Sequence, residues 1–366
     1  MTDEHPAAKP TLVVGLVGDP GLPYRLAREI ATDLSEELRR EVSDQWAWRV
    51  EAIEHRFTAD EQGELALEDV VDVVARRHQL DVVVCITDQP RRSGMRPIVA
   101  DINRRARVAI TSLPALGALR LRHRARHAVV RLVGELVTDA VANLPPEGRV
   151  APDTKRPAEL SPFVRTASVD GDIDVRFVGG GRHSRARLLA GMVRANRPWL
   201  LVPHLSSAFA AAFAAGAVVL VTETTWKMAA ALDSSRLAVA AVLGVATMVA
   251  WLVIDHGMWE RASSPEEREL AQLYNATTLI TVTIGVLCLY AGLFVAGLLA
   301  EILLLPRSVL GSVLGRPAGA ADYLALAWLL ATIATVGGAV GTGFASDDAV
   351  LQAAYGYRQH ERRRQP

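Results

Sequence analysis

Residues 199–221 read WLLVPHLSSAFAAAFAAGAVVLV, and they mark the point where the solvent around this chain changes. Three more apolar stretches follow, at 237–254, 276–305 and 323–344. A helix rises about 1.5 Å per residue and the hydrocarbon core of a bilayer is about 30 Å thick, so about 20 apolar residues can cross it. The residues before 199 are rich in arginine and alternate between strand and helix patterns. We therefore predict an α/β cytoplasmic domain followed by an all-α four-helix transmembrane bundle.

The composition narrows the class of protein. The 366 residues include 40 basic and 40 acidic side chains, so the net charge gives no reason to expect nucleic-acid binding. Half of the residues are hydrophobic, as expected for a chain that is partly soluble and partly in a membrane. Cys85 falls in an apparent strand and Cys288 in an apolar stretch, so we expect no disulfide and a reducing compartment for the first domain. The polar residues 1–10 lack the apolar run of a signal peptide.

The placement of arginine predicts the orientation, because basic residues next to membrane spans stay on the cytoplasmic side. One side would hold the entry to the first stretch, the loop between the second and third, and the C-terminal tail. Those segments contain Arg182, Arg185, Arg187, Arg194, Arg197, Arg261, Arg268, Arg358, Arg362, Arg363 and Arg364. The two loops on the other side contain only Lys227, Arg236, Arg307 and Arg316. We therefore expect a multipass protein of the plasma (cell) membrane with both termini in the cytoplasm.

Local patterns divide the chain into six segments. The apolar run 11–18 predicts a buried strand, and the next helix has a stripe formed by Leu22, Leu26, Ile30, Leu34 and Leu38. Further strands are expected at 46–57, 82–86, 98–100 and 108–111, and helices at 67–78 and 119–143. Asp170-Gly171 between two alternating runs predicts a hairpin. The segments are a disordered N-terminus (1–10), the α/β domain (11–143), a proline-rich linker (144–161), a β-hairpin with a basic juxtamembrane helix (162–198), the transmembrane domain (199–345) and a basic cytoplasmic tail (346–366).

Two acidic residues and an arginine-rich loop form the candidate ligand site. Asp19 and Asp88 each follow a buried strand, where open α/β sheets usually bind ligands. Arg91, Arg92 and Arg96 come next and could hold a small anion. The alternative is an ordinary solvated loop. The nearby glycines have the spacing GxxGxxG instead of a nucleotide-binding fingerprint, which favours a tight turn.

Basic and small residues suggest further contacts. The juxtamembrane arginines at 182, 185, 187, 194 and 197 could bind anionic lipid headgroups, or simply mark the cytoplasmic flank of a span. Arg120, Arg122, Arg124 and Arg126 could contact lipid or an acidic partner, or begin a solvated helix; without nearby aromatic residues, nucleic acid is the weaker interpretation. Gly337 and Gly341 form a GxxxG pair that predicts close helix packing within the bundle. Whether the chain also forms a homo-oligomer is left open by the sequence.

Part of the first domain resembles the core of archaemetzincin-type zinc peptidases. The resemblance covers about 60 residues and consists of Ile86-Thr87-Asp88, the run Val108 to Leu113 and the long helix after it. In that family the helix carries HExxHxxGxxH, in which three histidines bind zinc and the glutamate activates water. Here His127 and Gly134 match, whereas Ala128 occupies the base position and Arg131 and Val137 the other two ligand positions. The resemblance therefore implies a degenerate core that has lost its zinc site, and we expect no metal and no cofactor.

The whole-chain pattern also resembles uncharacterised multipass membrane proteins of high-GC Gram-positive bacteria. The features that carry this resemblance are Leu273-Tyr274-Asn275-Ala276, Gly337-Gly338-Ala339 and the tail Ala354 to Arg358. It implies a plasma-membrane location and supplies no activity. With no complete catalytic motif, the leading hypothesis is a membrane-anchored α/β domain that binds, senses or scaffolds a protein partner or a small anionic ligand. The alternatives are an enzyme that uses Asp19, Asp88 and Arg91 on an anionic substrate, and a transporter or channel in which Glu301 takes part.

Overall fold

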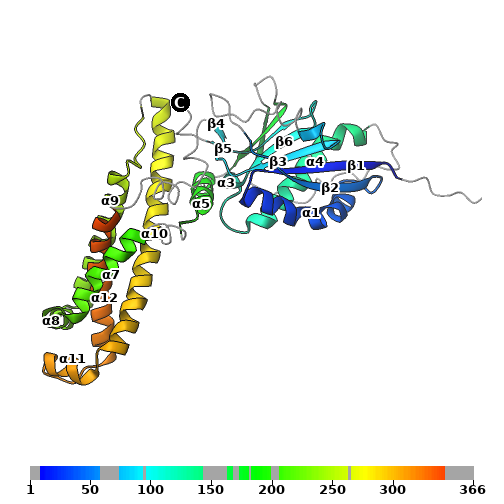
Figure 1. The fold of residues 1–366 in the computed structure, drawn as a ribbon. Coiled ribbons are helices and arrows are strands. Elements are labelled where there is room, and N and C mark those ends of the chain that lie inside the picture. The colour runs from blue at the N-terminus through cyan, green and yellow to red at the C-terminus, as the bar shows by residue number, and fades with distance from the viewer. Residues whose placement is uncertain are drawn as a thin grey trace, which may run out of the picture. The chain divides into compact units, whose positions relative to one another are not determined.

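In this computed structural model, the described residues are 9–57, 74–93, 96–142, 163–167, 173–180, 183–198, 206–262 and 265–342. The chain divides into two compact units, Met1–Met192 and Val193–Pro366. The first unit is an α/β domain and the second is all helical (Figure 1).

The first unit is built on one eight-stranded mixed sheet with the order β2-β1-β3-β6-β5-β8-β7, in which β4 pairs with β5 beside this path. The strands β1, β2, β3 and β6 are parallel, and β5, β8 and β7 continue the sheet in antiparallel pairs. Their bounds are β1 Thr11–Gly18, β2 Ala47–Glu54, β3 Val82–Thr87, β4 Arg92–Ser93, β5 Arg96–Asn103, β6 Val108–Ser112, β7 Phe163–Ala167 and β8 Val175–Gly179. The central strands are continuous apolar runs because both of their faces are covered.

Helices cover one face of this sheet. α1 (Leu22–Glu41) packs on β1, β2 and β3 and also on α4 (Leu121–Ala142), which contacts β3, β5 and β6. Of the predicted stripe, Leu26, Ile30, Leu34 and Leu38 are buried, whereas Leu22 at the start of the helix is half-buried. Each buried side chain stabilises the fold by about 1.5–3 kcal/mol. A second apolar cluster includes Val17, Cys85 and Ile110 from three neighbouring strands, packed with Phe57 and Val74. Two more helices, α3 (Leu113–Leu116) and α5 (Ser184–Asn196), follow β6 and β8.

The structure confirms the strands predicted at 11–18 and 82–86 and the helix predicted at 119–143, with small shifts of their ends. It lengthens the strand expected at 98–100 to Arg96–Asn103. β7 and β8 pair antiparallel, as the hairpin prediction required, and β8 also pairs with β5, so the hairpin belongs to the sheet of the first domain. The turn Asp170-Gly171, most of the helix expected at 67–78, the proline-rich linker, Arg182 and the basic tail lie outside the described residues.

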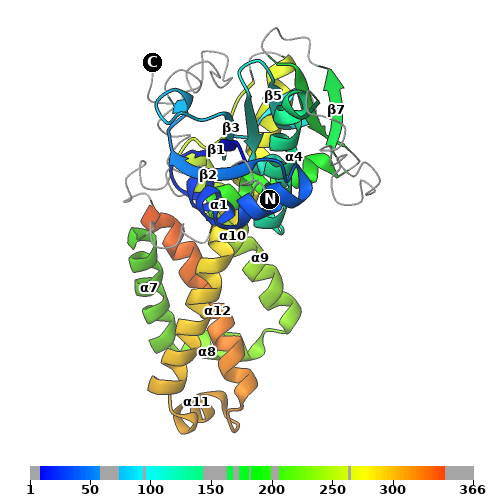
Figure 2. The ribbon, with the colours of Figure 1, turned by 90° about the vertical axis from the view of Figure 1, so that its right-hand side faces the viewer.

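The second unit is a set of helices arranged around α12 (Ala320–Thr342), which packs against α7 (Ser206–Val221), α9 (Ser234–Asp255) and α10 (Pro265–Leu304) (Figure 2). Met248, Leu252, Val282 and Val286 are among the fully buried side chains at its centre. Three described helices are long and apolar enough to cross a membrane, at Ser234–Asp255, Ala271–Leu304 and Ala320–Gly341. The described apolar part of α7, Ala210–Val221, is shorter, so the first predicted span is not established.

Two short helices lie at the same end of the long helices of this unit, α8 (Glu223–Ala231) and α11 (Arg307–Leu314) (Figures 1 and 2). They pack against each other and share an apolar cluster with α9 and α12. The hydroxyl of Tyr323 donates to the Leu305 carbonyl at 2.6 Å, and the indole N–H of Trp226 donates to the Leu220 carbonyl at 3.1 Å. These bonds satisfy backbone carbonyls where helices α7 and α10 end.

Candidate functional site

Asp19, the first predicted ligand residue, ties together three parts of the sheet edge. Its side chain is 1% exposed. Its Oδ1 accepts the backbone N–H of Phe57 at 3.1 Å, and its Oδ2 accepts the hydroxyl of Thr87 at 2.8 Å. Phe57 follows β2 and Thr87 ends β3, so the carboxylate joins the chain ends after three neighbouring strands. The arrangement gives Asp19 a structural role at this edge.

The glycines beside Asp19 form a tight strand-to-helix turn. A Cβ atom at Gly18 would lie 2.6 Å from Cα of Tyr24, so no side chain fits there. Gly21 has φ +98°, which is the region that favours glycine. The backbone N–H of Tyr24 closes the turn on the Asp19 carbonyl at 3.0 Å. The structure therefore supports the tight-turn interpretation of GxxGxxG.

The loop after β3 is held against the end of β6. The Gln89 backbone N–H donates to Oγ1 of Thr87 at 3.1 Å, and Oγ of Ser112 donates to the Gln89 carbonyl at 2.6 Å. Asp88, which lies between Thr87 and Gln89 in the sequence, is half-buried. The structure thus brings the ends of β1, β3 and β6 together at one edge, and the side chains that join them are those of Asp19, Thr87 and Ser112. The sequence prediction had placed Asp19 and Asp88 at strand ends but had not included Thr87 or Ser112.

Arg91 leaves this edge and joins an ion cluster on the sheet. Its Nη2 lies 2.8 Å from Oδ2 of Asp101, which is fully buried in β5. From β8, Arg176 donates through Nε to Oδ1 of Asp101 at 2.8 Å and through Nη2 to Oδ2 at 3.2 Å. Asp101 and Arg176 are directly paired in the sheet register, which explains the bidentate geometry. The cluster ties the loop before β4, strand β5 and strand β8 to one another.

The other two predicted arginines lie on the β4–β5 pair. Arg92 is paired with Pro97, and Arg96 is exposed opposite Ser93. The structure therefore separates the predicted set: Asp19 is buried at the turn, Arg91 is committed to Asp101, and Arg92 and Arg96 lie on a hairpin. The sequence prediction did not include Asp101 and Arg176. An acid inside the apolar run of β5 and a base inside that of β8 are the signal that could have found them, because buried charges are paired.

Cys85 is a potential nucleophile at the centre of the sheet. It is completely buried in β3. Burial raises the pKa of its thiol far above the ordinary value, and the negative charge of Asp19 raises it further. The thiol therefore stays protonated at physiological pH, as expected of an inert structural cysteine.

The basic residues of α4 fall into two groups. Arg126 contacts Glu37 and lies 3.6 Å from Asp33, and Arg122 lies 3.7 Å from Glu29, so these two face acids of α1. Arg124 does not make such a pair with the described residues. The rings of His123 and His127 lie 4.5 Å apart on the exposed side of the helix. Within the described ranges, no group of three His, Cys, Asp or Glu side chains is placed to hold a metal ion.

The predicted juxtamembrane arginines differ in exposure. Arg185 is exposed on α5, whereas Arg187, Arg194 and Arg197 are half-buried. Arg197 has φ +49° where α5 has ended. The Cγ of Arg187 lies close to Gly117 at the end of α3, so this side chain packs inside the α/β unit.

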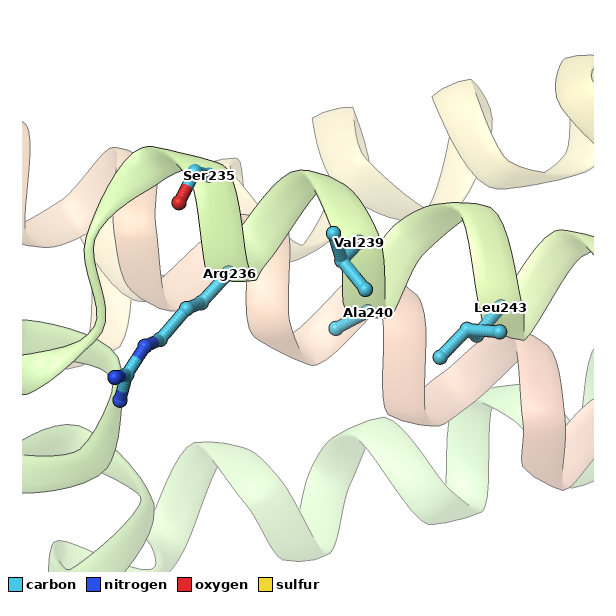
Figure 3. Close-up of a pocket in the computed structure, with 5 residues that line it drawn as sticks. All are labelled: Ser235, Arg236, Val239, Ala240 and Leu243. Atoms are coloured by element: carbon cyan, nitrogen blue, oxygen red, sulfur yellow. The ribbon is translucent and has the colours of Figure 1, made fainter.

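The remaining candidate residues are polar and small side chains of the helical unit. Both carboxylate oxygens of Glu301 on α10 are buried and have no hydrogen-bond partner among the described residues. A Cβ atom at Gly337 would lie 2.7 Å from Cβ of Ala215, so this glycine allows α12 to approach α7 closely; Gly341 is buried one turn later. A shallow hollow follows one side of α9, lined by Ser235, Arg236, Val239, Ala240 and Leu243 (Figure 3).

Similarity to known proteins does not assign this chain to a family or a function. No protein-family model matches it, and no curated protein or solved structure does either. Its function therefore has to be inferred from its own residues and their geometry.

Proposed function

We propose that this chain is an integral protein of the plasma membrane that crosses the bilayer four times, with both termini in the cytoplasm. Its α/β unit would act there as a non-catalytic module that binds, senses or scaffolds a partner or a small anionic ligand. The observation that carries the membrane assignment is the exposure of large apolar side chains along the long helices. Val242 is 68% exposed, Leu303 82% and Val340 65%. In water such a surface would be costly, whereas lipid tails would cover it.

The proposal of a fourth span rests on α7. This helix packs along α12 as the other long helices do, and its described part of 16 residues is about 24 Å long. The apolar residues 199–205 precede it in the sequence and would supply the remaining length. Four crossings place all three arginine-rich segments on one side of the membrane, which is the arrangement that basic residues favour.

A binding role fits the α/β unit better than catalysis. Asp19 and Arg91, the residues on which an enzyme at this edge would depend, are engaged in buried contacts that hold the fold together. The buried thiol of Cys85 is protonated. A module of this kind would recognise its ligand through residues at its surface.

The number of spans can be tested by labelling single cysteines with a membrane-impermeant maleimide in intact cells. Both tested variants would carry Cys288→Ala and retain the buried Cys85. With four spans, Ser312→Cys on α11 reacts from outside and Ala262→Cys, after α9, reacts only after the cells are permeabilised. With three spans and the first domain still in the cytoplasm, these two results are exchanged. That exchange would reject the proposed topology.

A second candidate function, transport or conduction through the helical unit, is favoured by one observation. Glu301 is a buried carboxyl group without a described hydrogen-bond partner on an apolar helix, and such groups often belong to ion pathways. In proteoliposomes, flux of protons or cations that Glu301→Gln abolishes would support this candidate. Glu223→Gln, at an exposed position on α8, is the matched control. A sealed protein with no flux above empty liposomes would reject it.

A further inference from the structure

Two arginines from different helices converge on Gly117. This residue ends α3 with φ +91°. A Cβ atom there would lie 2.5 Å from Cγ of Arg187 and 3.1 Å from Nη1 of Arg124. Arg124 comes from the first turn of α4 and Arg187 from the first turn of α5. Glycine is therefore the residue that leaves room for both side chains, and its backbone conformation is one that other residues rarely adopt.

No acidic side chain among the described residues pairs with either of the two arginines. Arg124 donates through Nη1 to the Leu116 carbonyl at 2.8 Å, and no ion pair of its guanidinium with a described residue is formed. The side chain of Arg187 has neither a hydrogen bond nor an ion pair with any described residue. Burial lowers the pKa of Arg187, and the positive charge of Arg124 lowers it further. Their neighbours Arg122 and Arg126 contrast with them, because those side chains contact acids of α1.

The helix ends add to the positive potential. Neither α4 nor α5 has an acidic residue in its first turn. The N-terminal end of a helix carries a partial positive charge, so arginine is normally unfavourable there and an anion is favourable. Nη1 of Arg124 and the Cγ and Cδ atoms of Arg187 lie beside Gly117, and the positive charge of Arg124 acts on the Arg187 guanidinium. Together with the first turns of the two helices, these side chains concentrate positive charge near Gly117. An anion held between the two arginines would relieve their repulsion.

We infer that Arg124 and Arg187 form a binding site for a phosphate-class anion. Guanidinium groups present planar N–H donors that match phosphate oxygens, and hydrogen bonds between such charged partners are stronger than neutral ones. The phosphate could belong to a soluble metabolite or to the headgroup of an anionic lipid. This site would supply a ligand class for the binding module proposed above. Its biological role rests on that proposal, whereas the site itself rests on the geometry of the two arginines.

The test uses the full-length protein purified in an uncharged maltoside detergent. Binding of inorganic phosphate and of dihexanoyl phosphatidylglycerol is measured by isothermal titration calorimetry at an ionic strength held constant with KCl, which suppresses non-specific attraction. Arg187→Gln removes one guanidinium from a side chain that makes no described contact through it, so the fold should tolerate the change. Arg187→Lys retains the positive charge but lacks the planar set of N–H donors of a guanidinium. Arg122→Gln is the matched control on α4. Thermal unfolding of each variant checks that it is folded.

We expect wild type and Arg122→Gln to bind alike, and Arg187→Gln to bind at least about tenfold more weakly, as loss of a charged hydrogen bond predicts. Arg187→Lys should fall between them. Binding of inorganic phosphate supports a soluble phosphate ligand, and binding of the short-chain lipid alone supports a headgroup. No binding of either probe above the KCl control, or equal binding by Arg187→Gln and wild type, overturns the inference. Neither result would affect the span count, because the labelling experiment measures that independently.

Discussion

The two units of this chain treat apolar side chains in opposite ways. In the α/β unit the large apolar residues of the sheet are buried, and Leu119 is the single large one among its described residues that is strongly exposed. In the helical unit, large apolar side chains are exposed along α7, α9, α10 and α12, while polar ones are buried between the helices. The same residue types therefore form the buried core of one unit and the exposed surface of the other, which is the surface that we propose to be in contact with lipid.

Buried polar groups show the same contrast. In the α/β unit the charge of Asp101 is neutralised across strands by two arginines. In the helical unit two buried threonines of α12 bond to their own helix: Oγ1 of Thr335 donates to the Ala331 carbonyl at 2.7 Å, and Oγ1 of Thr332 to the Trp328 carbonyl at 2.9 Å. Hydroxyl groups that form their hydrogen bonds within their own helix suit a membrane, because the bilayer interior holds no water to which they could bond instead.

The largest expected effect comes from removing the charge that joins three parts of the sheet. We expect Asp101→Ala to destabilise the α/β unit by about 3–5 kcal/mol, because it takes away the buried carboxylate that the guanidinium groups of Arg91 and Arg176 share. Hydrogen exchange of the β5 and β8 amides in the full chain would measure this loss. Glu36→Ala is the control, since Glu36 forms an exposed pair with Arg39 at 2.7 Å and should leave exchange unchanged. Equal protection in the two variants would contradict the structural role of the cluster.

The next prediction compares the same charged substitution at an exposed position of the helical unit and at an exposed position of the α/β unit. Val242→Arg places a charge at the middle of α9, where we expect it to oppose membrane insertion by about 2.5–3.5 kcal/mol. Thr32→Arg makes the same change at an exposed position of α1 and should not alter folding or expression. A glycosylation-based insertion assay measures the first variant, and solubility and thermal unfolding measure the second. If Val242→Arg inserted as well as wild type, lipid would not cover this face of α9.

A smaller effect is expected where two helices approach closely. Gly337→Val would force α12 away from Ala215 of α7, at a cost of about 1–3 kcal/mol. Thermal unfolding in detergent, followed by tryptophan fluorescence, measures this change. Gly292→Val on α10 serves as the control, because a Cβ atom at Gly292 would meet no atom of a neighbouring helix within 4 Å among the described residues. Equal unfolding temperatures would show that the α7–α12 contact does not depend on glycine.

The smallest effect concerns the cap of α9. Asp233 accepts the backbone N–H of Arg236 at 2.8 Å, and this bond, with that of the Ser235 hydroxyl, lowers the pKa of the carboxyl below its ordinary value of 3.8. A lowered pKa means that the cap stabilises the helix above the unfolded value and is lost as the pH falls through the folded one. Exchange of the first amides of α9 should therefore quicken in acid relative to the other helices. Asp233→Asn, which caps without titrating, should remove that dependence.

Continuous or periodic apolar patterns predicted much of this fold. The run 11–18 and the stripe from Leu26 to Leu38 predicted β1 and α1. A strand buried on both faces is a continuous apolar run, and a helix buried on one face has apolar residues every three or four positions, so both patterns can be recognised from residues close together in the sequence. The pairing of β8 with β5 could not be predicted in this way, since it joins residues about 75 positions apart across a linker. Arg91 was expected at the sheet edge but is paired with Asp101, because the acid that holds it lies inside the apolar run of β5, which had been read as core alone. The convergence of Arg124 and Arg187 on Gly117 likewise depends on where two helices begin in space.

The pairing of β8 with β5 also has a consequence for synthesis on the ribosome. The sheet cannot be completed until Gly179 has left the exit tunnel, and the first described apolar helix begins only 27 residues later, at Ser206. At about 5–20 residues per second, the interval between these two events is about one to five seconds. Under the four-span topology proposed above, the last strands find their places while the translating ribosome is being delivered to the insertion machinery. Slowing translation within this interval should favour a complete sheet before the first hydrophobic segment is captured.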